Sequence, residues 1–422
     1  MRPIIIPAFL FSIIIAFTAC KKNSTAPAIP PVVPVVHNNS QLTVTIDTAI
    51  GAIGHSSTPD TFAIDLKDPS QVGKVPVVFH IDPAATSNAG KKVNDSTYFD
   101  TIDISNNKVA GVTVTAGNGS STTYGLGFKY IFSNYTQANG LADSTVYGVY
   151  AQGDTIFATT TNGLSISTDG GQHFTNYTPA NGLGDYYTYG IYAQGNTIYV
   201  ATLRGLSISV NGGTTFTNHT MTNGLGANAV HGVYVQGNTI YAATIGGLSI
   251  STNGGSTFTN YTTANGLGNN SVFGVYALGN TIYAATIGGL SISADGGNTF
   301  TNYTKVNGLG SNQVYAAYSQ GNTVYAATRG GLSISTGNGS FTNYTTTNGL
   351  VNNWLQDVHV QGNTVYVASR GGLSISTDGG SHFASYTTIN GLGRNWIFLL
   401  YIQGNTLYAG TYGGGLTVMK PR

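Results

Sequence analysis

The sequence of 422 residues contains no glutamate, and only 7% of its residues are charged. Its single cysteine, Cys20, excludes an intramolecular disulfide bond. The formal net charge of +1 offers neither the basic field that nucleic-acid-binding proteins use nor an acidic tail for a cationic partner. Asparagine, threonine, serine and tyrosine supply the polarity instead, and this composition suits exposed β-sheet.

The carboxyl groups that remain are few and scattered. Between residues 129 and 419, four of the seven aspartates belong to turns, which leaves Asp143, Asp185 and Asp357 far apart in the sequence. A glycosidase needs two carboxyl groups that face each other across the scissile bond. The histidines of this region are also scattered, whereas a metal site needs ligands that converge. We therefore predict no catalytic residue, no metal and no cofactor.

The N-terminus carries one basic residue, Arg2, and an apolar run that ends in Phe17-Thr18-Ala19-Cys20. A basic residue followed by an apolar run and small residues is typical of an export signal. The end of the run resembles a bacterial lipobox, with Phe where Leu is usual. The resemblance implies cleavage before Cys20, acylation of this cysteine and anchoring to a membrane, because each buried methylene contributes about 0.8 kcal/mol. The alternative is an ordinary signal peptide or an uncleaved anchor.

Residues 1–19 are thus expected to be a lipoprotein signal peptide. Residues 20–41 are expected to be the acylated cysteine and a proline-rich tether, since such a segment buries little and stays extended. Residues 42–128 hold five or six alternating runs, such as Leu42–Ile46 and Val75–Ile81, separated by turn-rich spacers. This pattern favours a small β-sandwich-like domain of the immunoglobulin-like type, although other small β domains share the pattern.

From residue 129 onwards the sequence repeats. Asn-Gly-Leu triplets follow one another at steps of 42 residues, with one step of 41, and begin at Asn139, Asn181, Asn223, Asn265, Asn307, Asn348 and Asn390. A period in this range marks stacked or radially arranged units. Each complete repeat contains four β-rich runs joined by glycine-containing turns, and four consecutive antiparallel strands form one propeller blade. No segment has a helical period, which argues against a βα repeat.

The two ends of this region indicate how the blades close. A Phe-Thr-Asn-Tyr-Thr element or a close variant first occurs at Phe132–Thr136, before the first complete repeat, while the last repeat has three strands and stops near Met419. Pairing the extra strand with the incomplete repeat removes both exposed edges. We predict an all-β fold in which residues 129–422 form a seven-bladed β-propeller closed by its N-terminal strand. An open solenoid would not need such a complementary fragment.

Two family resemblances support this interpretation. Residues Asn265–Ser291 resemble the two-component-regulator propeller repeat, and Ser293–Phe300 resembles the Asp-box, S-x-D-x-G-x-x-(W/F). The first family is known as periplasmic sensor propellers, often glycan-responsive and fused to a membrane-spanning kinase. The Asp-box is a structural turn of sialidases and other propellers. The resemblances imply a receptor-like module, while the absence of glutamate removes a partner that a sialidase-like site is expected to supply to its tyrosine nucleophile.

Departures from the repeat indicate where a ligand could bind. The only tryptophans, Trp354 and Trp396, precede the first strand of the last two repeats, where other repeats have small or polar residues. Arg329 and Arg370 share one position in the turn between the second and third strands, and Arg394 lies two residues before Trp396. In a propeller these loops share one face. Trp offers a flat surface to a sugar ring and Arg a fork to carboxylate or sulfate. The alternative is that the tryptophans are packing variants and the arginines are solvated.

These observations predict a non-enzymatic, monomeric lipoprotein of the bacterial cell envelope, held at the outer membrane or cell surface by its lipid anchor. Its propeller would bind a glycan or an envelope protein on the loop face, and no nucleic acid. A structural or assembly scaffold without a small ligand is the alternative. A sialidase-like glycoside hydrolase is the least favoured possibility.

Overall fold

The computed structural model describes residues 130–337 and 339–421 in full and, towards the N-terminus, the backbone of strands β1 to β9. The chain divides into two compact units. One comprises residues 1–131 with 389–391 and 421–422, and the other comprises residues 132–388 and 392–420. Within the described part of the chain, no helix has the length and apolar character needed to cross a membrane.

Nine strands of the first unit form two sheets. One sheet has the order β1-β4-β7-β6 and the other has the order β2-β3-β9-β8-β5. The strands are β1 (Ile13–Ala16), β2 (Ile53–His55), β3 (Thr61–Ile64), β4 (Lys74–His80), β5 (Thr86–Ser87), β6 (Lys91–Asn94), β7 (Thr97–Asp103), β8 (Ala110–Thr115) and β9 (Ser121–Phe128). The packing that would define a sandwich, Cys20 and the proline-rich tether lie outside the described residues, so these assignments stay predictions.

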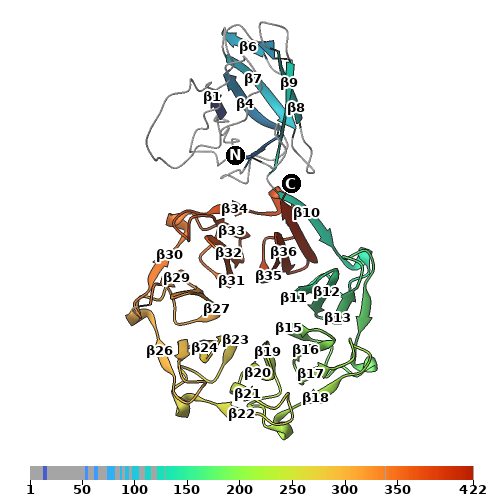
Figure 1. Cartoon of the computed structure of the whole chain (residues 1–422), viewed down its shortest axis with the longest axis vertical. Coiled ribbons are helices and arrows are strands. Elements are labelled where there is room, and N and C mark those ends of the chain that lie inside the picture. The colour runs from blue at the N-terminus through green and yellow to red at the C-terminus, as the bar shows by residue number, and fades with distance from the viewer. Residues whose placement is uncertain are drawn as a thin grey trace, which may run out of the picture. The chain divides into compact units, whose positions relative to one another are not determined.

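The second unit is a β-propeller of seven four-stranded sheets (Figure 1). The predicted all-β, seven-bladed fold is confirmed. From the centre outwards, blade one consists of β11 (Val146–Gln152), β12 (Thr155–Thr160), β13 (Gly163–Ser167) and β14 (Thr175–Tyr177), and blade two of β15 (Thr188–Gln194), β16 (Thr197–Thr202), β17 (Gly205–Ser209) and β18 (Thr217–His219). Blade three consists of β19 (Val230–Gln236), β20 (Thr239–Thr244), β21 (Gly247–Ser251) and β22 (Thr259–Tyr261), and blade four of β23 (Val272–Leu278), β24 (Thr281–Thr286), β25 (Gly289–Ser293) and β26 (Thr301–Tyr303). Blade five consists of β27 (Val314–Gln320), β28 (Thr323–Thr328), β29 (Gly331–Ser335) and β30 (Thr342–Tyr344), and blade six of β31 (Leu355–Gln361), β32 (Thr364–Ser369), β33 (Leu373–Ser376) and β34 (Ala384–Tyr386).

Blade seven closes the ring as the sequence predicted. It consists of β35 (Ile397–Gln403), β36 (Thr406–Thr411) and β37 (Leu416–Pro421), and its outer strand is β10 (Tyr130–Tyr135) from the start of the propeller. Thr417 Oγ1 donates a hydrogen bond to Asn134 Oδ1 at 2.6 Å, which joins the two ends of the propeller. The Gln403 side chain also bonds to the Gly153 carbonyl of blade one at 2.9 Å.

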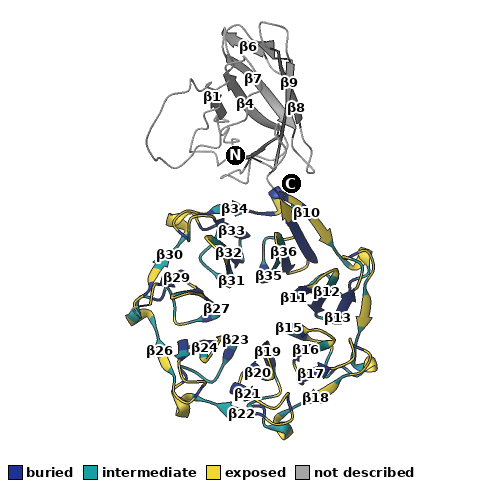
Figure 2. Cartoon of the chain, in the orientation of Figure 1, coloured by how far each residue is buried: buried dark blue, intermediate teal, exposed yellow. Residues whose placement is uncertain are grey.

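The Gly-Leu-Ser-Ile-Ser strands have both faces buried because each blade packs between two others (Figure 2). Leu164 and Ile166 of blade one pack against residues of blade two, including Leu183. The serines point the opposite way and are also buried. Ser165 Oγ accepts a bond from the Ala142 backbone at 3.0 Å and donates to Asn176 Oδ1 at 2.7 Å, so the hydroxyl satisfies two neighbours at once.

The Asn-Gly-Leu triplet ends a short 3-10 helix that the sequence analysis did not predict. Thr136 caps the first of these helices, and the Asn139 side chain accepts a bond from the Thr136 backbone. Gly140 then adopts φ +97°, a left-handed conformation that favours glycine, and Leu141 is buried. Each blade connection contains one such turn, namely η2 (Gln137–Asn139), η3 (Pro179–Asn181), η4 (Met221–Asn223), η5 (Thr263–Asn265), η6 (Lys305–Asn307), η7 (Thr346–Asn348) and η8 (Thr388–Asn390).

Candidate functional site

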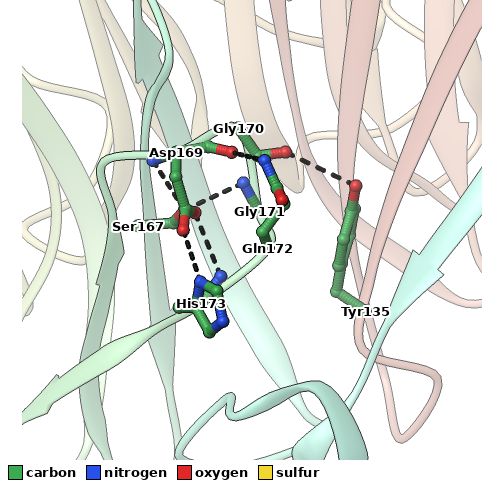
Figure 3. A network of polar contacts seen from close by, with 7 residues as sticks. All are labelled: Tyr135, Ser167, Asp169, Gly170, Gly171, Gln172 and His173. Atoms are coloured by element: carbon green, nitrogen blue, oxygen red, sulfur yellow. Dashed lines mark hydrogen bonds and ion pairs between the residues drawn. The ribbon is translucent and has the colours of Figure 1, made fainter.

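The Asp-box aspartates are engaged within their own turns (Figure 3). Asp169 Oδ1 accepts bonds from the Ser167 hydroxyl at 2.7 Å and from the His173 backbone at 3.0 Å, and Oδ2 lies 2.6 Å from His173 Nδ1. The backbone bond from His173 is the main reason that the pKa of Asp169 lies far below its usual range. Asp378 and His382 repeat this arrangement. These pairs therefore stabilise turns.

The structure brings four of the five predicted ligand-binding residues into one stack. The Arg370 guanidinium carbon lies 3.2 Å from the ring centre of Trp354 and 4.1 Å from that of Trp396. The Arg329 guanidinium carbon lies 4.2 Å from the ring centre of Trp354. Arg394 is exposed and makes no ring contact, hydrogen bond or ion pair with these residues among those that the structure describes. Arg329, Trp354, Arg370 and Trp396 are called the Arg–Trp stack below.

Backbone hydrogen bonds hold the Arg–Trp stack in place. The Arg370 amide donates to the Trp354 carbonyl at 3.1 Å, so the turn after β32 is tied to the residue that precedes β31. The same bond joins Arg329 to Gln313 in blade five at 3.0 Å. Trp354 is fixed further by the Asn352 side chain, which accepts its amide hydrogen at 2.7 Å. Adjacent blades thereby place alternating guanidinium groups and indole rings beside one another.

The positive charges of the Arg–Trp stack have no carboxylate partner among the described residues. Arg329 Nη1 donates to Gln313 Oε1 at 3.0 Å, whereas Arg204 in blade two pairs with Asp185 at 3.0 Å. Burial lowers the pKa of Arg370, and the charge of Arg329 lowers it further. Within the described region, Arg370 Nε and both indole N–H groups of the stack are buried and form no hydrogen bond. The arrangement therefore has unused donors and uncompensated positive charge.

A central channel of about 450 Å³ is a second candidate site, which the repeat pattern did not predict. Its walls come from the innermost strand of every blade. One ring of side chains consists of Tyr147, Tyr189, His231, Phe273, Tyr315, Gln356 and Phe398, and the other consists of Tyr150, Tyr192, Tyr234, Tyr276, Tyr318, His359 and Tyr401.

A β-bulge explains why both rings face the channel. Tyr147 and Tyr150 are three residues apart, and in a regular strand such residues point to opposite faces. The register between β11 and β12 shifts between Val146 and Gly148, so the parity changes between the two tyrosines. Gly148 also lets neighbouring blades approach, since a Cβ at this position would lie 2.3 Å from the Tyr189 carbonyl oxygen.

Blade six interrupts the aromatic channel with Gln356, Asp357 and His359. In blades one to four the position of Asp357 is glycine. Its two carboxyl oxygens accept the amide hydrogens of Val358 and of Leu400 in blade seven, both at 2.8 Å. Burial raises the pKa of Asp357 to about 7, although these backbone bonds favour the ionised form. Burial also lowers the pKa of His359 to about 4.

The Arg–Trp stack borders one end of this channel. The Trp396 ring centre lies 5.3 Å from that of Phe398, which lines the channel. Tyr315, another lining residue, is close enough to Arg370 to affect its pKa. Trp354 and Arg370 belong to blade six, the same blade that supplies the polar channel residues. The departures from the repeat therefore gather around one blade.

No family model and no curated protein matches this sequence. Among solved structures, the extracellular domain assigned to a hybrid two-component system of B. thetaiotaomicron is 18% identical, with a TM-score of 0.58, over 69% of this chain and 42% of its own length. A second such domain from B. thetaiotaomicron is 13% identical, with a TM-score of 0.56, over 90% of this chain and 54% of its own length. This chain thus spans only about half of each domain.

YCF48 bound to D1 peptide is also similar in structure. It is 12% identical to this chain, with a TM-score of 0.54, over 70% of this chain and 97% of its own length. At such identities the likeness extends to the fold alone. The propeller of this chain therefore resembles those of extracellular sensor domains and of a peptide-bound protein.

Proposed function

We propose that this chain is a non-enzymatic binding protein of the bacterial cell envelope, anchored through Cys20, whose loop face binds an acidic glycan. The observation that carries the proposal is the Arg–Trp stack, in which two guanidinium groups lie against Trp354 without a carboxylate partner among the described residues. A carboxylate or sulfate group would relieve the repulsion between Arg329 and Arg370. It would also accept charge-assisted hydrogen bonds from the guanidinium groups.

The geometry also defines how such a ligand would bind. Arginine that stacks on an aromatic ring uses its face, which leaves the N–H groups at its edge free for bidentate bonds to a planar anion. Guanidinium groups already lie over Trp354, so the anion rather than a sugar ring is proposed as the contact at this residue. The extracellular location of the two B. thetaiotaomicron domains agrees with an envelope protein exposed to such polymers.

A binding screen of the full-length protein tests this proposal. It compares carboxylated and sulfated oligosaccharides with neutral ones of the same length, and includes acidic peptides because YCF48 was solved with D1 peptide. We expect anionic glycans to bind and Arg370→Gln to weaken their binding about tenfold or more, as for loss of a charge-assisted contact of about 1.5–3 kcal/mol. Added salt should weaken binding as well.

Arg204→Gln is the matched control because Arg204 lies in the equivalent turn of blade two but pairs with Asp185. It should leave glycan binding unchanged. Equal binding of neutral and anionic glycans, or wild-type affinity of the Arg370→Gln variant, would contradict the proposal. Preference for peptides over all glycans would replace the glycan with an envelope protein as the partner.

A further inference from the structure

The central channel combines aromatic walls with a single acidic group. Among its described lining residues, none is lysine or arginine, and Asp357 provides the only carboxyl group. The Asp357 oxygens are bound by two backbone amides, and no ion pair to this residue occurs in the described part of the chain. The walls and the charge are therefore both suited to a positively charged occupant, because aromatic faces carry partial negative charge.

The ring contacts show that the aromatic ring containing Tyr150 is continuous except at blade six. Tyr150 lies 4.3 Å from Tyr401 and 5.0 Å from Tyr192, measured between ring centres, and the series continues to His359, which lies 4.6 Å from Tyr318. Most neighbouring planes are tilted, by 39° and 46° at Tyr150, whereas Tyr276 and Tyr318 are stacked at 28°. Tyrosine rings therefore line the channel over most of its circumference.

The aromatic ring containing Tyr147 is interrupted at the same blade. Tyr147 contacts Phe398 and Tyr189 at ring-centre distances of 4.7 and 5.2 Å, whereas blade six contributes Gln356 instead of an aromatic ring. An aromatic enclosure with one polar side is the arrangement that holds alkylated ammonium groups, whose methyl groups pack on rings while the charge faces a carboxylate. A volume of about 450 Å³ lies within the range of small-molecule sites.

We propose that the central channel binds a small alkylated ammonium ion, with the tyrosine rings as its cage and the Asp357 carboxylate as its counter-charge. This site adjoins the Arg–Trp stack but contains none of its residues. Removal of the Arg370 charge should therefore not weaken ammonium binding, and loss of glycan binding would not affect the inference.

Calorimetric titration of the full-length protein at pH 8, where Asp357 is ionised, with choline and with its neutral isostere 3,3-dimethylbutan-1-ol tests the site. The two molecules have nearly the same shape, so only the charge differs. We expect choline to bind at least about tenfold more tightly than the alcohol, which corresponds to about 1.4 kcal/mol. Equal affinity for the two, or no choline binding at millimolar concentration, would overturn the proposal whatever the behaviour of any variant.

Variants then locate the site. Asp357→Asn should weaken choline binding about tenfold or more, and Asp357→Gly should do the same while restoring the residue that four other blades carry. Asp295→Asn is the matched control, because Asp295 lies in an Asp-box turn and two other blades have asparagine there. Tyr234→Phe keeps the ring and should retain binding, whereas Tyr234→Leu should weaken it. Unchanged choline affinity in folded Asp357 variants would overturn the assignment.

Discussion

Asp357 is the residue whose protonation should be coupled most strongly to folding. Its pKa is about 7 in the folded protein, mainly because of burial, and near 4 in an unfolded chain. Between these values the folded protein holds a proton that the unfolded chain has released. The contribution of Asp357 to stability therefore falls as the pH rises from about 4 to about 7, and is constant above that range.

Urea denaturation of the wild type and of Asp357→Asn at pH 5 and pH 8 measures this coupling. We expect the free energy of unfolding of the wild type, relative to the variant, to be about 1–3 kcal/mol lower at pH 8 than at pH 5. His359, His231 and His219 have lowered pKa values and contribute with the opposite sign, since they favour folding as the pH rises. They are present in both proteins and cancel in the comparison. A pH-independent difference would show that Asp357 stays ionised when folded.

At the scale of the element, the glutamine that ends the innermost strand bonds to the next blade in blades one, three, five and seven. Gln320 shows this best, since its side chain both donates to the Gly362 carbonyl at 2.9 Å and accepts from the Gly362 amide at 3.1 Å. Gln236 likewise donates to the Gly279 carbonyl at 3.2 Å. Blade four cannot form this bond, because Leu278 occupies the position and is 48% exposed.

Leu278→Gln should therefore stabilise the propeller by about 0.5–1 kcal/mol, the net value of one hydrogen bond. The increase should appear as a higher midpoint in urea without a change of slope. Leu278→Ala is the control, since it removes the exposed leucine but supplies no donor or acceptor. If both variants are equally stable, the glutamine bonds contribute nothing at this position.

The strands and turns also show which features of the structure could be predicted from the sequence. The period, the hairpin turns at positions such as Gly153 and the closing strand followed from residue patterns that are local. The aromatic channel did not, because the bulge after Val146 changes the alternation and brings Tyr147 and Tyr150 to one side. The sequence placed Trp354 and Arg370 on one face, but their direct stacking depends on the spacing between blades, which no local pattern contains.

At the scale of the whole molecule, the ring is closed by strand β10, and this closure can be tested with one pair of substitutions. Phe132 in β10 and Phe341 in blade five occupy the same repeat position and are 7% and 6% exposed. In a closed ring both side chains fill an equivalent site between blades. Phe132→Ala and Phe341→Ala should then destabilise the propeller by similar amounts, about 3–5 kcal/mol.

Tryptophan fluorescence provides a selective measurement, because Trp354 and Trp396 are the only tryptophans and lie in blades six and seven. If closure makes the ring cooperative, Phe341→Ala should shift the fluorescence transition as much as the transition followed by circular dichroism, although blade five contains no tryptophan. An open ring behaves as a linear array in which a terminal strand stabilises only its neighbour. A Phe132→Ala variant as stable as the wild type, beside a destabilised Phe341→Ala variant, would therefore show that β10 does not hold the ring closed in solution.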